Sequence, residues 1–403
     1  MELHESVLIS LLSYAIRAEH PAFNEVNNIS WDRLFEEAAA HQVHTLLYPL
    51  IADLGEDSIP APLLSKWKQE TKSAAARQLQ HVEQVNTIIK VFHNNSISVI
   101  ALKGLVLRNY YPKPELRTMG DGDLLIHKAN MKKAKKLLQK MGYRLKENTP
   151  RHFCFSHKYF PLLEMHQCLS EKEIQCIYPD LTTAVLKRSE RIEIKGMDAS
   201  IFTLSIEDMF LHLLLHFAGH LMSEGIGLRS VCDIVLFLEK EGLKLDMGYL
   251  QDKLLTCRLT HLAATLVRLC EKYFSLKLPC IFPGAVEDSD VDLLMEDILD
   301  AGVYGRKTMN RDISGSLLKY YSSCNHEKHN TLTLKHKALF YFPCSKWLHS
   351  RYWYAKKFPL LLPVAWIHRG LRNCFRLKSL YLYKEAAIIS QNRALLINRL
   401  KLR

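Results

Sequence analysis

The sequence lacks the features that mark an exported or membrane-spanning protein. Its ten cysteines are scattered singly, and no two of them form a C-x-x-C pair. The apolar runs Val7–Ile16 and Phe358–Trp366 are shorter than the ~18–20 residues that cross a bilayer. The opening Met-Glu-Leu-His-Glu has no basic region of the kind that begins a secretory signal. We therefore expect a cytoplasmic protein with reduced cysteines and no transmembrane segment.

Motifs of several large enzyme classes are also missing. The chain has no His-Asp dipeptide, which argues against a phosphohydrolase of the HD type. It has no G-x-S-x-G, no P-loop and no kinase-type glycine loop. The composition is nevertheless that of an ordinary globular protein, with 48% apolar and 24% charged residues. Any catalytic site must therefore be built from another pattern.

Acidic residues are almost absent from the C-terminal segment 345–403. This segment holds thirteen Lys and Arg and a single acid, Glu385, which accounts for the whole net charge of +12. The rest of the chain is electrically balanced. The segment also carries aromatic residues, so three interpretations stay open: a helical face packed on the body, a surface for nucleotides or nucleic acid, or a contact with an anionic membrane. Two of these three interpretations of segment 345–403 predict an anionic partner for it.

The periodicity of apolar residues predicts an α+β protein in which a small α/β unit is embedded between helical segments. We expect a helical segment over 1–95, an α/β core over 96–204, a helical domain over 205–305, and a polar linker with a basic helical segment over 306–403. Strands are expected over 98–102, 124–126, 152–159 and 162–169. One continuous helical run is expected over 247–274. Ser30, Asn130 and Ser205 are predicted helix N-caps.

Four polar residues on two expected strands form the most informative pattern. Residues i and i+2 of a strand point to the same face, so Asp121 and Asp123 present two carboxylates together, and Glu164 and His166 do the same later in the chain. If the two strands are neighbours, three carboxylates converge and repel one another. Mg²⁺ or Mn²⁺ would relieve that repulsion, because hard cations prefer oxygen ligands. Such a pair of ions can activate an attacking oxygen and stabilise a leaving pyrophosphate.

Residues upstream of the aspartates suit a phosphate-binding role. Gly104 follows an expected strand and opens a helical turn, where the backbone can approach a phosphate. Lys103 can neutralise the charge of a triphosphate, and Arg117 offers a bidentate fork to phosphate oxygens. An isolated Asp-Gly-Asp is more often a plain turn, but the apolar run after Asp123 and the later Glu164 favour the metal interpretation.

These residues and their order resemble the uncharacterised nucleotidyltransferase-like family of bacteria, which belongs to the DNA polymerase β-type nucleotidyltransferase superfamily. The central block carries the resemblance: Leu102-Lys103-Gly104, Tyr111-Pro112, Arg117, Asp121-x-Asp123-Leu-Leu-Ile, Gly142-Tyr143 and Glu164-x-His166. The resemblance implies a mixed sheet with helices, with Asp121 and Asp123 as metal ligands and Glu164 as the third acid. The superfamily usually has Gly-Ser where this chain has Lys103-Gly104, and an apolar residue where it has Gly122.

The resemblance extends to a helical segment with three histidines. His212, His216 and His220 recur every four residues, which would also suit a shared metal ion, although packed structural histidines are the more common case. The resemblance includes His216, His220 and Arg229, which, with His166, we expect on the substrate side of the cleft. A further candidate, Cys324-x-His326-x-x-His329, has the composition of a zinc fragment but lies in a polar segment, 307–336, that favours a loop.

Nucleotidyl transfer from an NTP to an acceptor that the sequence does not name is the function that this pattern favours. Two alternatives stay open. One is a glycosyltransferase that binds Mn²⁺ and a nucleotide sugar through Asp121-x-Asp123. In such enzymes an apolar strand usually runs into the acidic pair, whereas in this chain the apolar run follows the pair, which counts against this alternative. The other is a non-catalytic nucleotide-binding protein on the same fold, which the Lys103-Gly104 departure favours.

Overall fold

The structure is a computed structural model of the whole chain. It describes residues 1–20, 29–55, 58–149, 152–169, 185–278, 286–305, 352–374 and 379–402, together with single residues at 282, 311, 314, 318, 342, 345 and 348. Most of segment 307–336, including Cys324, His326 and His329, lies outside the described residues. No helix in the described ranges is long and apolar enough to cross a membrane.

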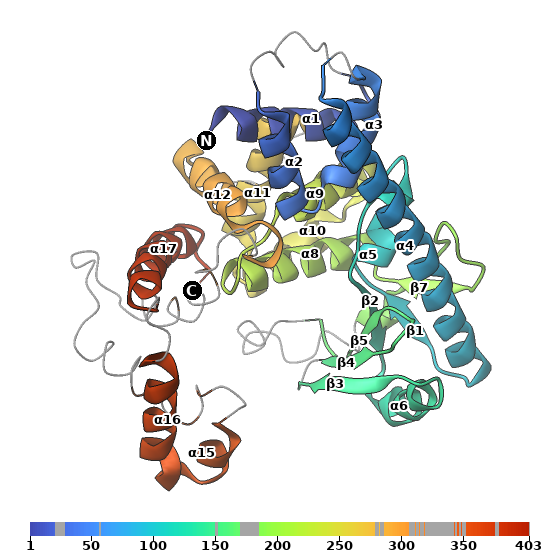
Figure 1. Cartoon of the computed structure of the whole chain (residues 1–403). Helices are drawn as coiled ribbons and strands as arrows, with labels where there is room; N and C mark the ends of the chain where they lie inside the picture. Colours follow the sequence, from blue (N-terminus) through green and yellow to red (C-terminus); the bar gives the residue numbers. More distant parts are fainter. Residues whose placement is uncertain are drawn as a thin grey trace.

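Helices form the N-terminal part of the protein, as the sequence predicts (Figure 1). They are α1 (Leu3–Ala15), α2 (Trp31–Ala40), α3 (His44–Leu54) and the long α4 (Ala61–Asn94). The Ser30 side chain accepts a hydrogen bond from the Arg33 amide, so the predicted N-cap of α2 is confirmed. Helix α4 buries Val85 against the sheet, next to Gly122.

Seven strands in the described residues form one mixed sheet, which confirms the α+β fold class. The strands are β1 (Val99–Ala101), β2 (Asp121–Ile126), β3 (Arg144–Asn148), β4 (His152–Ser156), β5 (Leu162–His166), β6 (Glu190–Ile192) and β7 (Ile201–Thr203). Their order across the sheet is β3-β4-β5-β2-β1-β7-β6. Strand β2 is parallel to β5 and antiparallel to β1, while β1 is parallel to β7. This order places β2 and β5 side by side at the centre.

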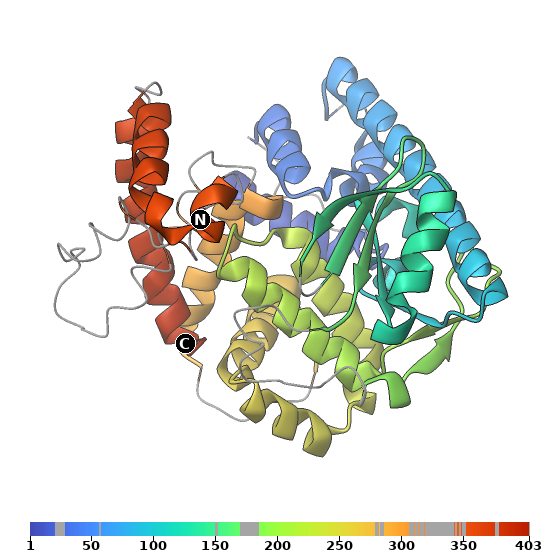
Figure 2. The ribbon, with the colours of Figure 1, turned by 90° about the horizontal axis from the view of Figure 1, so that it is seen from below.

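Helices cover both faces of the sheet. Figure 2 shows α4 on one side of the strands and α8 (Ile206–Leu221) on the other. The short α5 (Gly104–Leu107) follows β1, and α6 (Met131–Lys140) follows β2. Asn130 is the N-cap residue of α6, as predicted, but its side chain makes no capping hydrogen bond. The side chain that caps a backbone amide here is His127, which accepts from the Ala129 amide at the start of the preceding 3₁₀ turn.

The helices after the sheet pack with the N-terminal helices in one hydrophobic core. They are α8, α9 (Leu228–Glu241), α10 (Met247–Thr256), α11 (Thr260–Phe274) and α12 (Asp288–Ala301). Ser205 caps α8 by accepting from the Asp208 amide, as predicted. The single helix expected over 247–274 is wrong, because Arg258 takes a φ of 55° and the Leu259 amide closes α10 on the Leu254 carbonyl.

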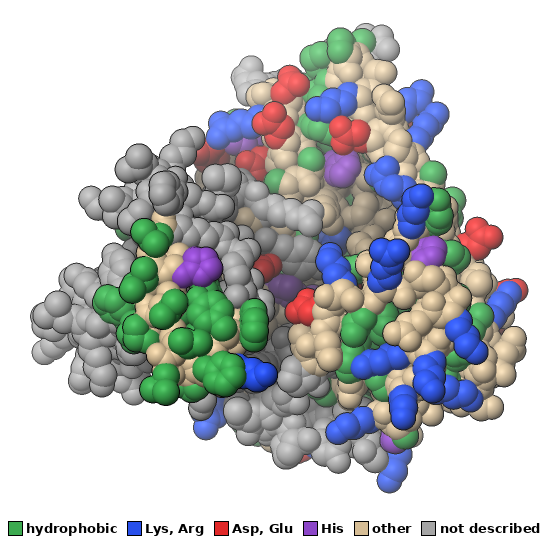
Figure 3. Space-filling view, turned by 60° about the horizontal axis from the view of Figure 1, so that its bottom comes forward, with side chains coloured by type: hydrophobic (Ala, Val, Ile, Leu, Met, Phe, Trp, Pro, Cys, Tyr) green, Lys and Arg blue, Asp and Glu red, His purple; other side chains and the backbone are tan. Residues whose placement is uncertain are grey.

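The basic C-terminal segment contains three described α-helices. They are α15 (Trp353–Lys357), α16 (Leu362–Cys374) and α17 (Ser379–Arg399). The end of α17 joins the main core through Leu396, Ile397 and Leu400. In contrast, α15 and α16 pack around a small apolar cluster of their own. Figure 3 shows many hydrophobic side chains on the surface of this α15–α16 hairpin.

Candidate active site

The strand register brings the predicted acidic residues to one face of the sheet. In the parallel pair β2–β5, Asp123 lies opposite Glu164 and Asp121 lies opposite Leu162. Side chains two residues apart share a face, so Asp121, Asp123 and Glu164 all point to the side covered by α8. Gly122 points to the opposite side, where a Cβ atom would lie 3.0 Å from Val85 of α4. The glycine between the aspartates therefore allows α4 to approach the strand closely.

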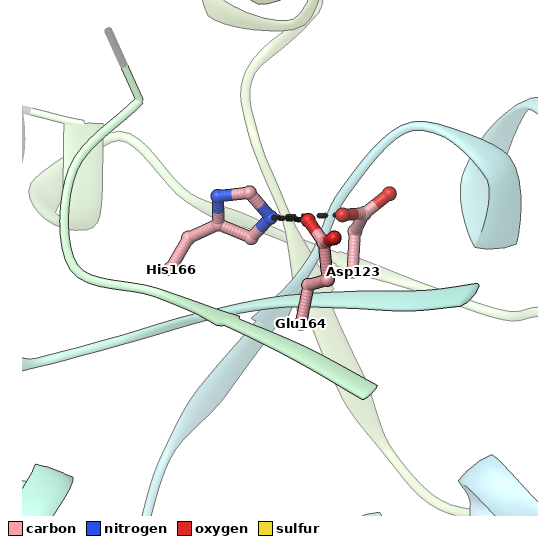
Figure 4. A group of neighbouring side chains, drawn as sticks. All are labelled: Asp123, Glu164 and His166. Atoms are coloured by element: carbon pink, nitrogen blue, oxygen red, sulfur yellow. Dashed lines mark hydrogen bonds and ion pairs between the residues drawn. The ribbon is translucent and has the colours of Figure 1, made fainter. Parts of the chain in front are cut away.

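Asp123, Glu164 and His166 form a tight group on this face (Figure 4). His166 Nε2 lies 2.8 Å from Asp123 Oδ1 and 3.5 Å from Glu164 Oε2. One potential ligand atom from each residue lies within 4.8 Å of the others. Asp121 lies two residues before Asp123 on the same face but outside this group. The third member found in the described residues is thus an imidazole rather than the second aspartate.

Lys103 provides a positive charge beside the group. Its Nζ lies 3.6 Å from Asp123 Oδ2, and both side chains are largely buried. The residue adopts a φ of 36° immediately before α5, a conformation rare outside glycine. Burial alone would raise the pKa of Asp123, but the Lys103 ammonium and the His166 hydrogen bond lower it below its ordinary value. Asp123 is therefore the carboxylate that the protein itself keeps ionised.

The other two carboxyl groups show the cost of crowding like charges. Burial and the neighbouring Asp123 and Asp121 raise the pKa of Glu164 to about 7. Burial and the charge of Asp123 also raise the pKa of Asp121. A divalent cation would remove this penalty, because it favours the ionised form of every carboxylate around it.

The donor set fits a divalent metal ion. Carboxylate oxygens, as in Asp121, Asp123 and Glu164, are the ligands that Mg²⁺ and Mn²⁺ prefer. The pKa of Glu164 is raised by the negative charges of its neighbours, and a bound divalent cation would balance those charges. The His166 nitrogen beside them suits Mn²⁺ better than Mg²⁺. These residues therefore fit the cofactor that the sequence predicts.

Arg117 lies in a buried ion pair at the edge of the site. Its Nε and Nη2 atoms donate to the two carboxylate oxygens of Asp233 at 2.9 and 2.6 Å. Tyr111 donates its hydroxyl to the same carboxylate at 2.8 Å. The remaining nitrogen, Nη1, packs on Gly104, where a Cβ atom would lie only 2.9 Å away. The contact explains the need for glycine at 104 and ties the start of α5 to α9.

A cavity of about 470 Å³ opens between the acidic face and helices α8 and α9. Every residue predicted for the site lines it: Lys103, Gly104, Arg117, Asp121, Asp123, Glu164, His166, His216, His220 and Arg229. Arg229 Nη1 donates to the Gln42 side chain at 2.6 Å and to the Thr118 carbonyl at 2.9 Å. Arg229 therefore links α9 to the segment that leads into β2.

The three histidines of α8 have distinct surroundings. His212 is buried against the acidic face, and burial and the nearby Lys103 lower its pKa well below the ordinary value. The rings of His216 and His220 meet edge to face, 4.3 Å apart. Among the described residues, the group of Asp123, Glu164 and His166 is the one potential metal site found, and no α8 histidine belongs to it. Their side chains thus form an imidazole-rich wall of the cavity, in which burial keeps the pKa of both His212 and His216 well below the ordinary value.

Two residues that shape the site were not singled out by sequence reasoning. Gln78 of α4 holds both backbone groups of Met119, donating to the carbonyl and accepting from the amide at 3.1 Å each. His152 of β4 lies beside His166, with ring centroids 5.6 Å apart. A single glutamine on a long helix carries no recognisable signal, whereas His152 could have been found from its place opposite His166 once the β4–β5 pairing was known.

The chain matches one family model, described as "Uncharacterised nucleotidyltransferase", over residues 27–275. Searches among curated proteins and among solved structures found no match. The matched segment covers more than half of the chain and contains Lys103, Asp121, Asp123 and Glu164, so this protein belongs to the uncharacterised nucleotidyltransferase family.

Proposed function

We propose that the protein transfers a nucleoside monophosphate from an NTP to an acceptor nucleophile. The observation that carries this proposal is the group of Asp123, Glu164 and His166, with Asp121 beside it, at the wall of a cavity of about 470 Å³. Membership of a nucleotidyltransferase family supports the reaction class. The acceptor oxygen would form a bond to the α-phosphorus, the α–β anhydride bond would break, and pyrophosphate would leave with its electron pair.

Asp121, Asp123 and Glu164 are the residues that we propose for holding Mg²⁺ or Mn²⁺. The bound ion would supply charge neutralisation for the triphosphate and for the leaving pyrophosphate. The Glu164 carboxyl, with a pKa of about 7, can complete this site or accept the proton that the acceptor loses. Asp123 stays ionised throughout, because Lys103 and His166 hold its pKa low.

Lys103, Gly104 and Arg117 are proposed to position the triphosphate. The backbone at Gly104 begins α5 on the cavity wall, and the place of a Cβ is taken by Arg117 and Met119, which hold the start of the helix. The Lys103 ammonium already faces the acidic group and can bridge from Asp123 to a phosphate oxygen. Arg117 acts mainly through its ion pair with Asp233, which fixes the guanidinium against Gly104.

The acceptor side is proposed to lie toward α8 and α9. His216, His220 and Arg229 line the part of the cavity built by these helices, and His166 lines the same cavity from within the acidic group, 2.8 Å from Asp123. Burial keeps the pKa of His216 well below its ordinary value, so its neutral ring can exchange hydrogen bonds with an acceptor without adding charge.

One observation favours a second candidate, a nucleotide-binding protein without turnover. Asp123 already has two partners within the protein, His166 at 2.8 Å and Lys103 at 3.6 Å, and a metal ion would have to compete with both. An NTP that bound to the lysine without ordering the metal would be held but not cleaved. Retained NTP binding with no pyrophosphate release would identify this case.

The test compares Asp121→Asn and Asp123→Asn with the wild type. Mg²⁺-dependent NTP binding and pyrophosphate release would be measured for each, with Mn²⁺ in parallel. Asp252→Asn is the matched control, because this exposed aspartate lies on α10 and its loss removes the same charge. We expect both site variants to lose metal-dependent binding and the control to keep it. Unchanged binding and turnover in both site variants would refute the proposal.

A further inference from the structure

The α15–α16 hairpin exposes a continuous apolar surface. Its side chains that are exposed over more than half of their area are Trp353, Phe358, Leu360, Val364, Ile367 and Leu371. On α16, Val364, Ile367 and Leu371 lie three and four residues apart and so share one side of the helix. Leu360, in the 3₁₀ turn Pro359–Leu361 just before α16, is 94% exposed. Exposed apolar patches of this kind mark interaction surfaces.

The exposed row is not needed to hold the hairpin together. The hairpin has its own interior, in which Leu348, Tyr352, Ala355 and Ala365 are buried against one another. Ala365 is fully buried, while its neighbour Val364 is more than half exposed. On α16, Ala365 faces the interior of the hairpin, whereas Val364, Ile367 and Leu371 face outward. Folding of the described residues leaves this surface uncovered.

Helix α6 places a set of lysines at the same end of the molecule. In Figure 1 both α6 and the hairpin lie at the bottom, and Figure 3, with the bottom turned forward, shows hydrophobic side chains over the hairpin and Lys and Arg side chains beyond them on the same face. The exposed lysines of α6 are Lys132, Lys133, Lys136 and Lys140. Residues Met131–Lys140 include no acid. We call the exposed apolar side chains of α15–α16 and these lysines the basal face.

The chemistry of the basal face distinguishes between possible occupants. A second copy of the chain would bring together two segments that each carry thirteen cations and one acid over 345–403, so like charges would oppose pairing. A nucleic acid would match the charge but would leave the aliphatic row of Val364, Ile367 and Leu371 without an apolar partner. An anionic lipid surface satisfies both components, because acyl chains receive the apolar side chains and headgroups receive the lysines.

We propose that the basal face docks on the surface of an anionic phospholipid bilayer. The aliphatic row and Trp353 enter the boundary between headgroups and acyl chains, and the α6 lysines contact the headgroup phosphates. Neither α15 nor α16 approaches the length of a membrane span, so the hairpin lies on the bilayer rather than across it. This inference does not depend on the proposed nucleotidyl transfer.

The test is flotation of the full-length protein with vesicles of phosphatidylcholine, with and without an equal share of phosphatidylglycerol. Leu360→Glu/Ile367→Glu removes the apolar contact at positions too exposed to affect folding. Leu243→Glu/Leu255→Glu is its matched control, since these residues are 77% and 69% exposed outside the basal face. Lys132→Gln/Lys136→Gln removes charge from the basal face, and Lys68→Gln/Lys72→Gln removes the same charge with the same spacing from α4.

We expect binding to the phosphatidylglycerol vesicles, weakened about tenfold or more by each basal-face variant and unchanged in each control. Failure of the wild type to float with these vesicles would overturn the proposal. Equal binding to phosphatidylcholine alone would also overturn it, because the lysines would then have no role. A dimer in light scattering that Leu360→Glu/Ile367→Glu dissociates, without vesicle binding, would assign the face to self-association instead.

Discussion

The Arg117–Asp233 ion pair allows a test of how strongly burial changes the folding free energy that is lost when one partner of an ion pair is removed. Asp233 accepts Arg117 Nη2 at 2.6 Å and the Tyr111 hydroxyl at 2.8 Å. Asp292 on α12 likewise accepts from one cationic side chain and one tyrosine hydroxyl at similar distances, from Lys272 at 2.6 Å and from Tyr273 at 2.7 Å. The side chains of the first pair are 5% and 7% exposed, and those of the second are 31% and 46% exposed.

Removing the carboxylate charge should therefore have very different effects at the two positions. Asp233→Asn leaves a buried guanidinium without its counter-charge, which costs about 3–5 kcal/mol of folding free energy. Asp292→Asn leaves an exposed ammonium that water solvates, which costs about 0–1 kcal/mol. In thermal unfolding, with about 2 °C lost per kcal/mol in a large domain, Asp233→Asn should lower the Tm by about 6–10 °C and Asp292→Asn by about 2 °C or less.

A double variant separates the loss of the pair from the loss of a single partner. Arg117→Met/Asp233→Val removes both charges and leaves apolar side chains of similar combined volume, so it should be more stable than Asp233→Asn alone. The Tyr111 hydroxyl then loses its acceptor, which limits the recovery to within about 1–3 kcal/mol of the wild type. Equal Tm losses in Asp233→Asn and Asp292→Asn would refute the argument from burial.

Three further predictions concern the sheet and the site. Gly122→Ala should cost about 1–3 kcal/mol, because the new Cβ lies 3.0 Å from Val85, and Val85→Ala should restore part of the lost Tm. Burial lowers the pKa of His81 from an ordinary 6.5 to about 4, so between these pH values the unfolded chain binds more protons than the folded protein. The free energy of unfolding should therefore fall by at most about 3 kcal/mol as the pH drops from 6.5 to 4. His81→Gln lacks this group, so the difference in Tm between the wild type and this variant should change over the same pH range. Because Glu164 has a pKa of about 7, Mg²⁺ affinity measured by calorimetry should rise with pH up to that value and then level off, and Glu164→Gln should flatten this dependence.

Local signals in the sequence predicted the elements well. Ser30 and Ser205 stand directly before apolar helical periods, and both cap helices as expected. The apolar run 124–126 predicted a strand entered from Asp121-Gly122-Asp123, and in the structure β2 begins at Asp121, so that the two aspartates lie on one face as expected. Strand β3 was not expected, because all five of its residues are exposed and show no alternation of apolar and polar side chains. Strands β6 and β7 have three residues each, too few to establish a period.

The partners of the site residues could not be read from the sequence. Arg117 and Asp233 are separated by 116 positions, so no local period links them. The same limit applies to Lys103, whose partner Asp123 becomes its neighbour only through the antiparallel pairing of β1 with β2. The sequence suggested that three carboxylates converge, whereas the tight group contains His166, because an imidazole two residues beyond Glu164 can reach across to Asp123.

The structure suggests what Lys103-Gly104 does at the position where the nucleotidyltransferase superfamily usually has Gly-Ser. A non-glycine residue with a φ of 36° costs about 1–3 kcal/mol and persists only where its surroundings enforce it. Here the Lys103 carbonyl accepts hydrogen bonds from the Val106 and Leu107 amides at 2.9 and 2.8 Å, which fixes the backbone at the start of α5. The strained backbone directs the ammonium to Asp123. The lysine thus keeps the carboxylate ionised before any cation arrives, and the same charge lies at the wall of the cavity in which we propose that the triphosphate binds.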